Sequence, residues 1–131
     1  AGIDAIEVSS GTAASGKEGP NRGKIDKPEV EGYNMEWAMQ VKDVVSCPVM
    51  AIGGFRSLDV VKIALDTVLM DYIALSRPLI RQPELPGLWA SGNRESATCI
   101  SCNKCFIPGL SEGGIYCVSK KKAEEKAATE A

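Results

Sequence analysis

"CPVMAIGG", residues 47–54, has the composition of a buried strand that ends in a tight turn. Its apolar run from Val49 to Ile52 stands between Pro48 and a pair of glycines. A proline is tolerated at the first position of a strand, because its missing N–H removes no ladder hydrogen bond there. A short apolar run bounded by turn residues is typical of a strand that is covered on both faces of a sheet.

The segments on both sides continue an alternation of strands and helices. "DAIEVSS" (4–10) and "DYIALS" (71–76) are short, mostly apolar runs that end in small residues, so both are predicted strands. Helices are predicted over 33–46 and 57–68, where apolar residues recur at helical spacing. This order predicts an α/β fold with a parallel sheet, and ligands of such folds bind at the carboxyl ends of the strands.

The two predicted helices have defined starts and apolar faces. Asn34 and Ser57 are the expected N-caps, because short polar side chains can accept a hydrogen bond from the first free N–H groups of a helix. The residues expected to face inward are Met35, Ala38, Val41 and Val45 on the first helix and Val60, Val61, Ala64, Leu65 and Val68 on the second.

The remaining segments are predicted to be less regular. Residues 11–32 hold five glycines and two prolines and should form a long loop, of a length typical of functional or disordered segments. A short helix is expected near 85–92. The charged stretch 120–131 has no apolar face and should be a frayed helix or a disordered tail.

Composition narrows the function classes. The 131 residues carry a formal net charge of −2, which gives no indication of nucleic-acid or membrane-surface binding. No apolar run is as long as a membrane span and nothing resembles a secretory signal, so a cytoplasmic location is expected. The chain has no histidine, which excludes a histidine base or metal ligand. Because nothing resembles a secretory signal, the clustered cysteines among the five favour metal or cluster ligation over disulfides.

The stretch "AIGGFRS" (51–57) is a candidate anion site. Gly53 and Gly54 directly follow a predicted strand, where their small size lets the backbone approach a ligand closely. Their N–H groups, with the start of the next helix, could bind a phosphate. The alternative is a tight strand-to-helix turn without a ligand.

A second candidate follows the next strand, in "IALSRPLI" (73–80). Arg77 comes directly after a buried strand, where its charge must be solvated or paired, and an arginine fork suits a phosphate. The alternative is a surface ion pair. Adjacent parallel strands would bring Gly53, Gly54 and Arg77 to one place, like the phosphate site between the last two strands of a (β/α)8 barrel.

Four segments together resemble one known family. "GIDAIEVSSG", "PVMAIGGFRS", "DYIALSRPLIRQPELP" and "ATCISCNKCF" are similar to the C-terminal part of the NADH:flavin oxidoreductase, or Old Yellow Enzyme, family. The similarity is greatest to its iron–sulfur branch, typified by 2,4-dienoyl-CoA reductase and trimethylamine dehydrogenase. It implies an FMN-binding TIM (β/α)8 barrel, of which residues 1–94 would be about the last three β/α units. A Cys-rich segment (95–118) and a polar tail (119–131) would follow.

The resemblance also implies the flavin contacts. The FMN phosphate would be bound by the backbone N–H groups of Gly53, Gly54 and Phe55 and by Ser76 and Arg77. The stretch "VSSG" (8–11) would lie near the flavin ring. NAD(P)H and a small unsaturated substrate would be partners of the whole enzyme, together with the missing N-terminal barrel units or a second copy of the chain.

The clustered cysteines take their meaning from the same resemblance. Cys99, Cys102, Cys105 and Cys117 would ligate a [4Fe–4S] cluster, although the relatives usually have three residues between the second and third cysteines and this chain has two. A zinc site with the same four cysteines is the alternative, and a small non-catalytic metal-binding module is the alternative function. Cys47 stands apart and is expected to be a small buried hydrophobe.

Overall fold

The three predicted strands pair side by side in chain order. The computed structural model describes residues 2–67 and 69–130 of the chain. Its strands are β1 (Ile6–Val8), β2 (Val49–Ile52) and β3 (Tyr72–Ala74), which form one parallel sheet in the order β1-β2-β3. Each strand is shorter than its predicted segment, because only these residues are paired in the ladder.

The register brings the carboxyl ends of the strands to one level. Val8 pairs with Ala51, and Ile52 pairs with Ala74. The segments that follow the three strands therefore leave the sheet from the same edge, which is the edge where a parallel α/β fold binds its ligands.

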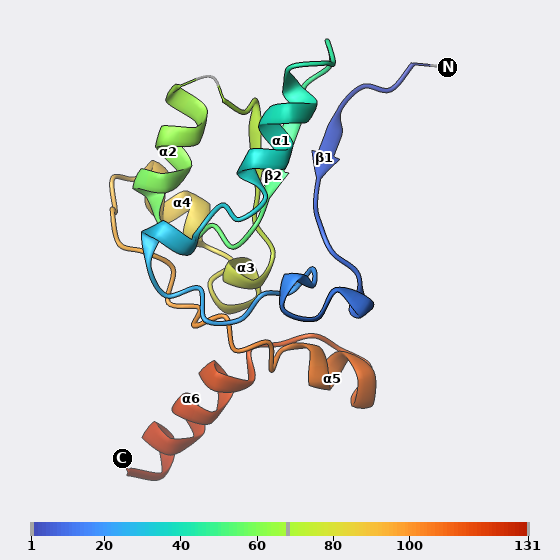
Figure 1. Ribbon diagram of the computed structural model, residues 1–131. Helices are drawn as coiled ribbons and strands as arrows, with labels where there is room; N and C mark the ends of the chain where they lie inside the picture. Colours follow the sequence, from blue (N-terminus) through green and yellow to red (C-terminus); the bar gives the residue numbers. More distant parts are fainter. Residues whose placement is uncertain (1, 68, 131) are drawn as a thin grey trace.

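Two helices cover the sheet as their apolar faces predict. Helix α1 (Met35–Lys42) packs against β1 and β2, and α2 (Leu58–Asp66) packs against β3 (Figure 1). The expected inward residues join the core, either fully or partly buried: Met35, Ala38, Val41, Val45, Val60, Val61 and Ala64. Leu65 is the exception, because it is 37% exposed and lines an open pocket beside β3, and Val68 lies outside the described residues.

Asn34 and Ser57 occupy the predicted N-cap positions, but neither side chain caps its helix. The Asn34 amide instead donates to the carbonyl of Ile52 at 2.6 Å and accepts from the Ser10 hydroxyl. The Ser57 hydroxyl donates to Glu31 at 2.6 Å. Tertiary partners therefore replace the local cap, and Asn34 links the segment after β1 to the last residue of β2.

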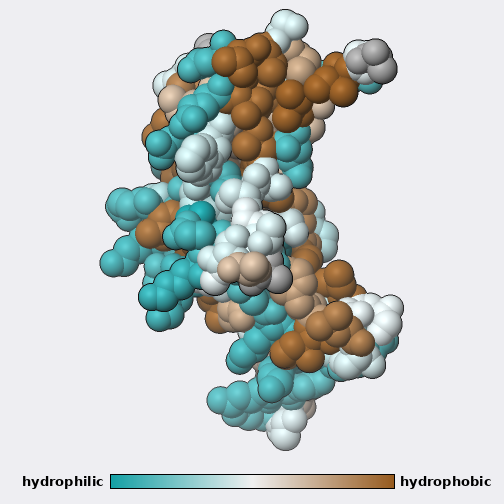
Figure 2. Space-filling model, turned by 45° about the vertical axis from the view of Figure 1, so that its right-hand side comes forward, coloured by the Kyte–Doolittle hydropathy of each residue, from teal (hydrophilic) through white to brown (hydrophobic). Residues whose placement is uncertain are grey.

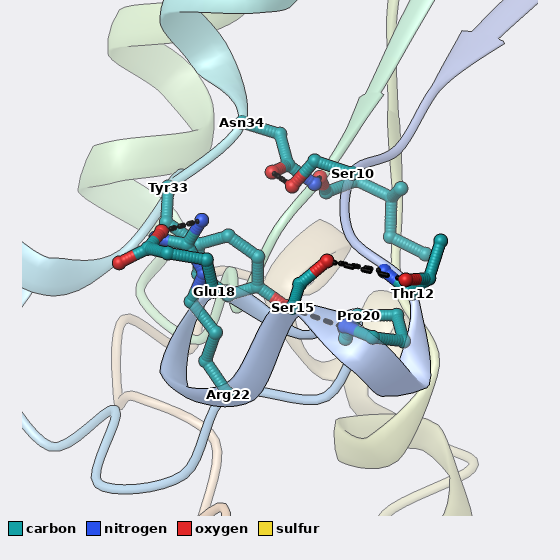
Figure 3. Close-up of polar contacts among 9 residues, drawn as sticks. Ser10, Thr12, Ser15, Glu18, Pro20, Arg22, Tyr33 and Asn34 are labelled. Carbon is teal, nitrogen blue, oxygen red and sulfur yellow. Dashed lines mark hydrogen bonds and ion pairs between the residues drawn. The ribbon is translucent and has the colours of Figure 1, made fainter.

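The long loop 11–32 is more ordered than its composition predicts. It contains two 3-10 helices, η1 (Ala13–Glu18) and η2 (Pro28–Val30). Figure 3 shows its polar contacts, which include the Tyr33 hydroxyl on the carbonyl of Pro20 at 3.1 Å and an ion pair between Glu18 and Arg22 at 2.5 Å. These bonds hold the loop across the carboxyl edge of the sheet.

The second half of the chain is helical beyond expectation. Its elements are α3 (Arg77–Arg81), α4 (Leu85–Ala90), α5 (Phe106–Ser111) and α6 (Val118–Glu130). Of these, only α4 was predicted as a helix, and for 120–131 the sequence left a frayed helix or a disordered tail as alternatives. Figure 1 shows α5 and α6 beyond the carboxyl ends of the strands, away from α1 and α2.

The surface carries apolar residues at both ends of the molecule (Figure 2). Ile3 is exposed beside β1, and Leu110 of α5 is 90% exposed at the opposite end. No helix in the described part of the chain combines the length and the apolar character that a bilayer crossing requires.

Asp71 joins three elements at the amino end of the sheet. Its carboxylate accepts from the backbone N–H of Val49 at 2.7 Å and pairs with Lys42 at the end of α1. The hydrogen bond from Lys42, followed by the one from Val49, lowers the pKa of Asp71 below its usual 3.8. A carboxyl group with a lowered pKa stabilises the fold above its unfolded-state pKa, and this stabilisation is lost as the pH falls through the folded-state pKa.

We therefore expect Asp71→Asn to lower the melting temperature at neutral pH and to lower it less as the pH falls below about 3.8. Thermal melts followed by circular dichroism across this range measure both effects. Asp66→Asn, on the exposed side of α2, is the matched control and should have a small effect at every pH. If the melting temperature of Asp71→Asn stays below that of the parent protein by the same amount at every pH, the role given to this carboxylate is contradicted.

Candidate functional site

A cavity of about 230 Å³ lies at the carboxyl edge of the sheet. Residues from all three strand ends and from the long loop surround it. Its lining is formed by Glu7, Ser9, Pro20, Asn21, Tyr33, Asn34, Ile52, Gly54, Phe55, Arg56, Ala74, Leu75, Ser76, Arg77, Pro78 and Ser101.

Four of the five residues predicted to bind the FMN phosphate line this cavity: Gly54, Phe55, Ser76 and Arg77. Gly53 does not, because it is packed against the start of α1. A Cβ added at Gly53 would lie 3.0 Å from the backbone nitrogen of Asn34, and its carbonyl accepts from the N–H of Tyr33 at 3.1 Å. Gly53 therefore has a packing role, and its N–H contact with a phosphate stays a prediction.

Gly54 shapes the floor of the cavity. Its φ of +73° lies in the left-handed region, and an added Cβ would approach the Tyr33 ring to 2.9 Å. Only glycine meets both demands without strain. Within the described residues, the N–H groups of Gly54 and Phe55 make no hydrogen bond, so both are available to an anion in the cavity.

The start of α2 already has its anion. Glu31 accepts from the backbone N–H groups of Arg56 and Ser57 at 2.8 and 2.9 Å, and from the Ser57 hydroxyl. A carboxylate at this position satisfies free N–H groups and the positive end of the helix. An internal carboxylate thus takes the N–H groups of Arg56 and Ser57 directly before α2, and Gly54, Phe55 and Arg77 keep donors at the cavity.

Arg77 is buried, with 8% of its surface exposed, so the alternative of a surface ion pair does not hold. Its Nη1 donates to the carbonyl of Arg22 at 2.8 Å and to the Asn103 side chain. Its Nε and Nη2 make no hydrogen bond within the described part of the chain. The guanidinium therefore keeps donors for a further acceptor while it fixes two loops.

The four clustered cysteines converge on a second, smaller cavity of about 20 Å³. Their side chains share its lining with two arginines and neighbouring residues: Cys99, Cys102, Cys105, Cys117, Arg77, Ile80, Arg81, Ile100, Asn103 and Ser119. All four are free thiols. Cys47 is also free but lies at the amino end of β2, where it is half-buried.

A bent loop presents the first three cysteines. Ser101 and Asn103 have φ values of +50° and +60°, and the Asn103 amide donates to the carbonyl of Asn21 at 2.8 Å. Burial raises the pKa of Cys105, whereas a hydrogen bond from the backbone N–H of Lys104 lowers the pKa of Cys102. Cys102 is thus the more readily deprotonated of the two.

The donor set suits a thiophilic metal or cluster, since four thiols line one cavity. Within residues 2–67 and 69–130, however, no group of three or more metal-ligating side chains is already arranged to hold a metal ion. The cavity itself is about the size of one water molecule. Binding a cluster would therefore require the sulfur atoms to be rearranged around it.

Several residues of the site were missed in the sequence. Glu31, Asn34 and Asn103 each make bonds across the site to residues distant in sequence. The sequence could have indicated Asn103, because a polar residue between two clustered cysteines is not expected to pack in the core. Glu31 and Asn34 had none, since their partners are set only by the fold.

Comparisons with known proteins identify the class. No protein-family model matches the chain. The curated proteins that match are named as reductases or as an oxidase. These similarities support an oxidoreductase family.

The chain is 36% identical over 97 residues to the bilirubin reductase of Clostridium symbiosum, a match that covers 72% of the chain and 26% of that protein. It is 31% identical over 79 residues to the 4,4'-dithiodibutanoate disulfide reductase of Rhodococcus erythropolis, covering 60% of the chain and 19% of that protein. It is 32% identical over 80 residues to the NADH oxidase of Thermoanaerobacter brockii, a match that covers 60% of the chain and 12% of that protein. The matches thus span about a quarter or less of these relatives.

Glu31→Ala should destabilise the protein, because it leaves the N–H groups of Arg56 and Ser57 without their acceptor. An unsatisfied buried donor costs about 1–3 kcal/mol in unfolding free energy. Chemical denaturation measures the loss, with Glu29→Ala, exposed in η2, as the matched control. Equal losses in the two variants would show that Glu31 does not hold the start of α2.

Proposed function

We propose that this chain is the C-terminal part of an FMN-dependent NADH:flavin oxidoreductase of the Old Yellow Enzyme family, in its iron–sulfur branch. The observation that carries the proposal is the adjacency of two cavities, one with free backbone N–H groups and the other with four thiols, both lined by Arg77. The named reductases and the NADH oxidase among the relatives support this class of reaction.

The first cavity would hold the FMN phosphate. The N–H groups of Gly54 and Phe55 supply neutral donors, and the free nitrogens of Arg77 supply charge-assisted ones. Ser76 adds a hydroxyl at the rim. Because Gly54 and Arg77 follow neighbouring parallel strands, the phosphate would be bound as in the last units of a (β/α)8 barrel.

The chemistry would belong to the cofactors, and the chain would position them. When bound, FMN supplies hydride transfer between a nicotinamide nucleotide and an activated alkene or similar acceptor, and a cluster supplies single-electron transfer. Ser9 and Glu7 line the same cavity from the β1 side and would lie closer to the ring than the phosphate residues do.

A barrel would also account for the edges of the sheet. Within the described residues, β1 and β3 each pair on one side only. The unpaired N–H and C=O groups of an edge strand can form hydrogen bonds with a further strand. In the proposed enzyme the remaining barrel units would pair with these edges, which fits the small share of the relatives that the chain matches.

The second cavity would hold a [4Fe–4S] cluster ligated by Cys99, Cys102, Cys105 and Cys117. Four thiolates satisfy such a cluster, and hydrogen bonds to the sulfur atoms tune its potential. A zinc ion with the same four ligands is the competing occupant. The distinction is experimental, since iron clusters are coloured and zinc is not.

Arg77→Ala should weaken FMN binding in the complete enzyme much more than Arg94→Ala, which removes the same charge from the exposed surface, where Arg94 pairs with Asp59. A charge-assisted bond to a phosphate contributes about 1.5–3 kcal/mol, which is roughly ten- to a hundredfold in affinity. Titration of the flavin-free protein, followed by flavin fluorescence, measures both dissociation constants. Equal effects of the two substitutions would remove the argument for Arg77.

Cys102→Ser should lose most of the bound iron, because a hydroxyl is a poor substitute for a thiolate ligand. We expect about four iron atoms per chain in the parent protein. Cys47→Ser, which changes a cysteine at the amino end of β2, should keep them. Metal analysis of the anaerobically purified proteins measures the iron and zinc bound per chain. Stoichiometric zinc in place of iron would reassign the site to structural zinc.

A further inference from the structure

Arg81 joins the two ends of the cysteine segment. Its Nε donates to the Thr98 hydroxyl at 2.8 Å, directly before Cys99, and its Nη1 donates to the sulfur of Cys117 at 3.4 Å. Residues 100–116 separate the first of the four cysteines from the last along the chain. One guanidinium therefore connects the residue before Cys99 with the sulfur of Cys117.

The position of Arg81 is fixed by its neighbours. Gln82 accepts from the backbone N–H and the hydroxyl of Thr98 at 2.6 and 2.8 Å. Lys120, at the start of α6, donates to the backbone carbonyl of Arg81 at 3.2 Å. Thr98 and α6 are thereby both held against the end of α3, so the contact between Arg81 and Cys117 is part of a connected network.

A fixed positive charge beside a thiolate affects a redox centre in a defined direction. Reduction adds negative charge to a cluster, and a neighbouring guanidinium stabilises the reduced state more than the oxidised state. A hydrogen bond to a ligating sulfur acts in the same direction, because it also stabilises the more negative state.

We propose that Arg81 is a positioning residue of the cysteine site, which holds Cys117 beside Thr98 and Cys99 and raises the reduction potential of the cluster bound there. This inference rests on the proposed cluster. The two arginines of α3 would then have different roles. Arg77 would bind the phosphate and hold Asn103, whereas Arg81 contacts the sulfur of a proposed ligand directly.

The test compares Arg81→Gln with Arg81→Lys and with Arg94→Gln, all purified anaerobically. Arg94 pairs with Asp59 on the exposed surface and is the control for loss of one positive charge. The readouts are iron per chain and the reduction potential of the cluster, followed by electron paramagnetic resonance during a redox titration. Arg81→Gln should make reduction about tenfold less favourable, a shift of about 59 mV for one electron. Arg81→Lys should shift the potential less, and Arg94→Gln should leave it unchanged.

The outcomes separate this inference from the function on which it rests. A parent protein without iron would overturn both. Iron-loaded parent and Arg81→Gln proteins with the same potential would overturn the role of Arg81 and leave the cluster assignment standing. Loss of iron from Arg81→Gln, with full iron in Arg94→Gln, would support the positioning role.

Discussion

The candidate site depends on the hydrogen bonds that the buried guanidinium of Arg77 makes to two loops. Burying a charge to 8% exposure is costly, and both hydrogen bonds that Arg77 makes within the described residues go from Nη1 to loops that are remote in sequence. The carbonyl of Arg22 belongs to the long loop after β1, and Asn103 belongs to the cysteine loop. Because one side chain at the end of β3 holds both, the edge of the sheet, the long loop and the cysteines form one structure.

This arrangement gives the two cavities a shared wall. Arg77 lines both, and Ser101 of the cysteine loop lines the larger cavity at the carboxyl edge of the sheet. A flavin and a cluster placed in these cavities would therefore be neighbours, which is what single-electron exchange between them requires. The similarity to reductases and to an NADH oxidase agrees with such a use, although the resemblance covers only a small part of those proteins.

The strands and the main helices were predictable because their signals are local. The run from Val49 to Ile52 between proline and glycines fixes β2, and Arg77 after β3 was predicted from the cost of burying its charge. The caps were not predictable, since Asn34 and Ser57 bind partners that only the tertiary structure supplies. The same holds for Glu31, which takes the helix terminus expected to serve a ligand. Spacing indicated that the four cysteines act together, but it contained no information on Arg81, whose contact with Cys117 crosses 36 positions.

The central claim is that a phosphate and an iron–sulfur cluster lie on either side of Arg77. A crystal structure of the anaerobically purified protein with FMN, with diffraction recorded at the iron and zinc absorption edges, tests it most directly. The account predicts phosphate density against the N–H groups of Gly54 and Phe55 and the guanidinium of Arg77, and an iron signal among Cys99, Cys102, Cys105 and Cys117. A zinc signal, or four unligated thiols together with FMN bound elsewhere, would contradict it.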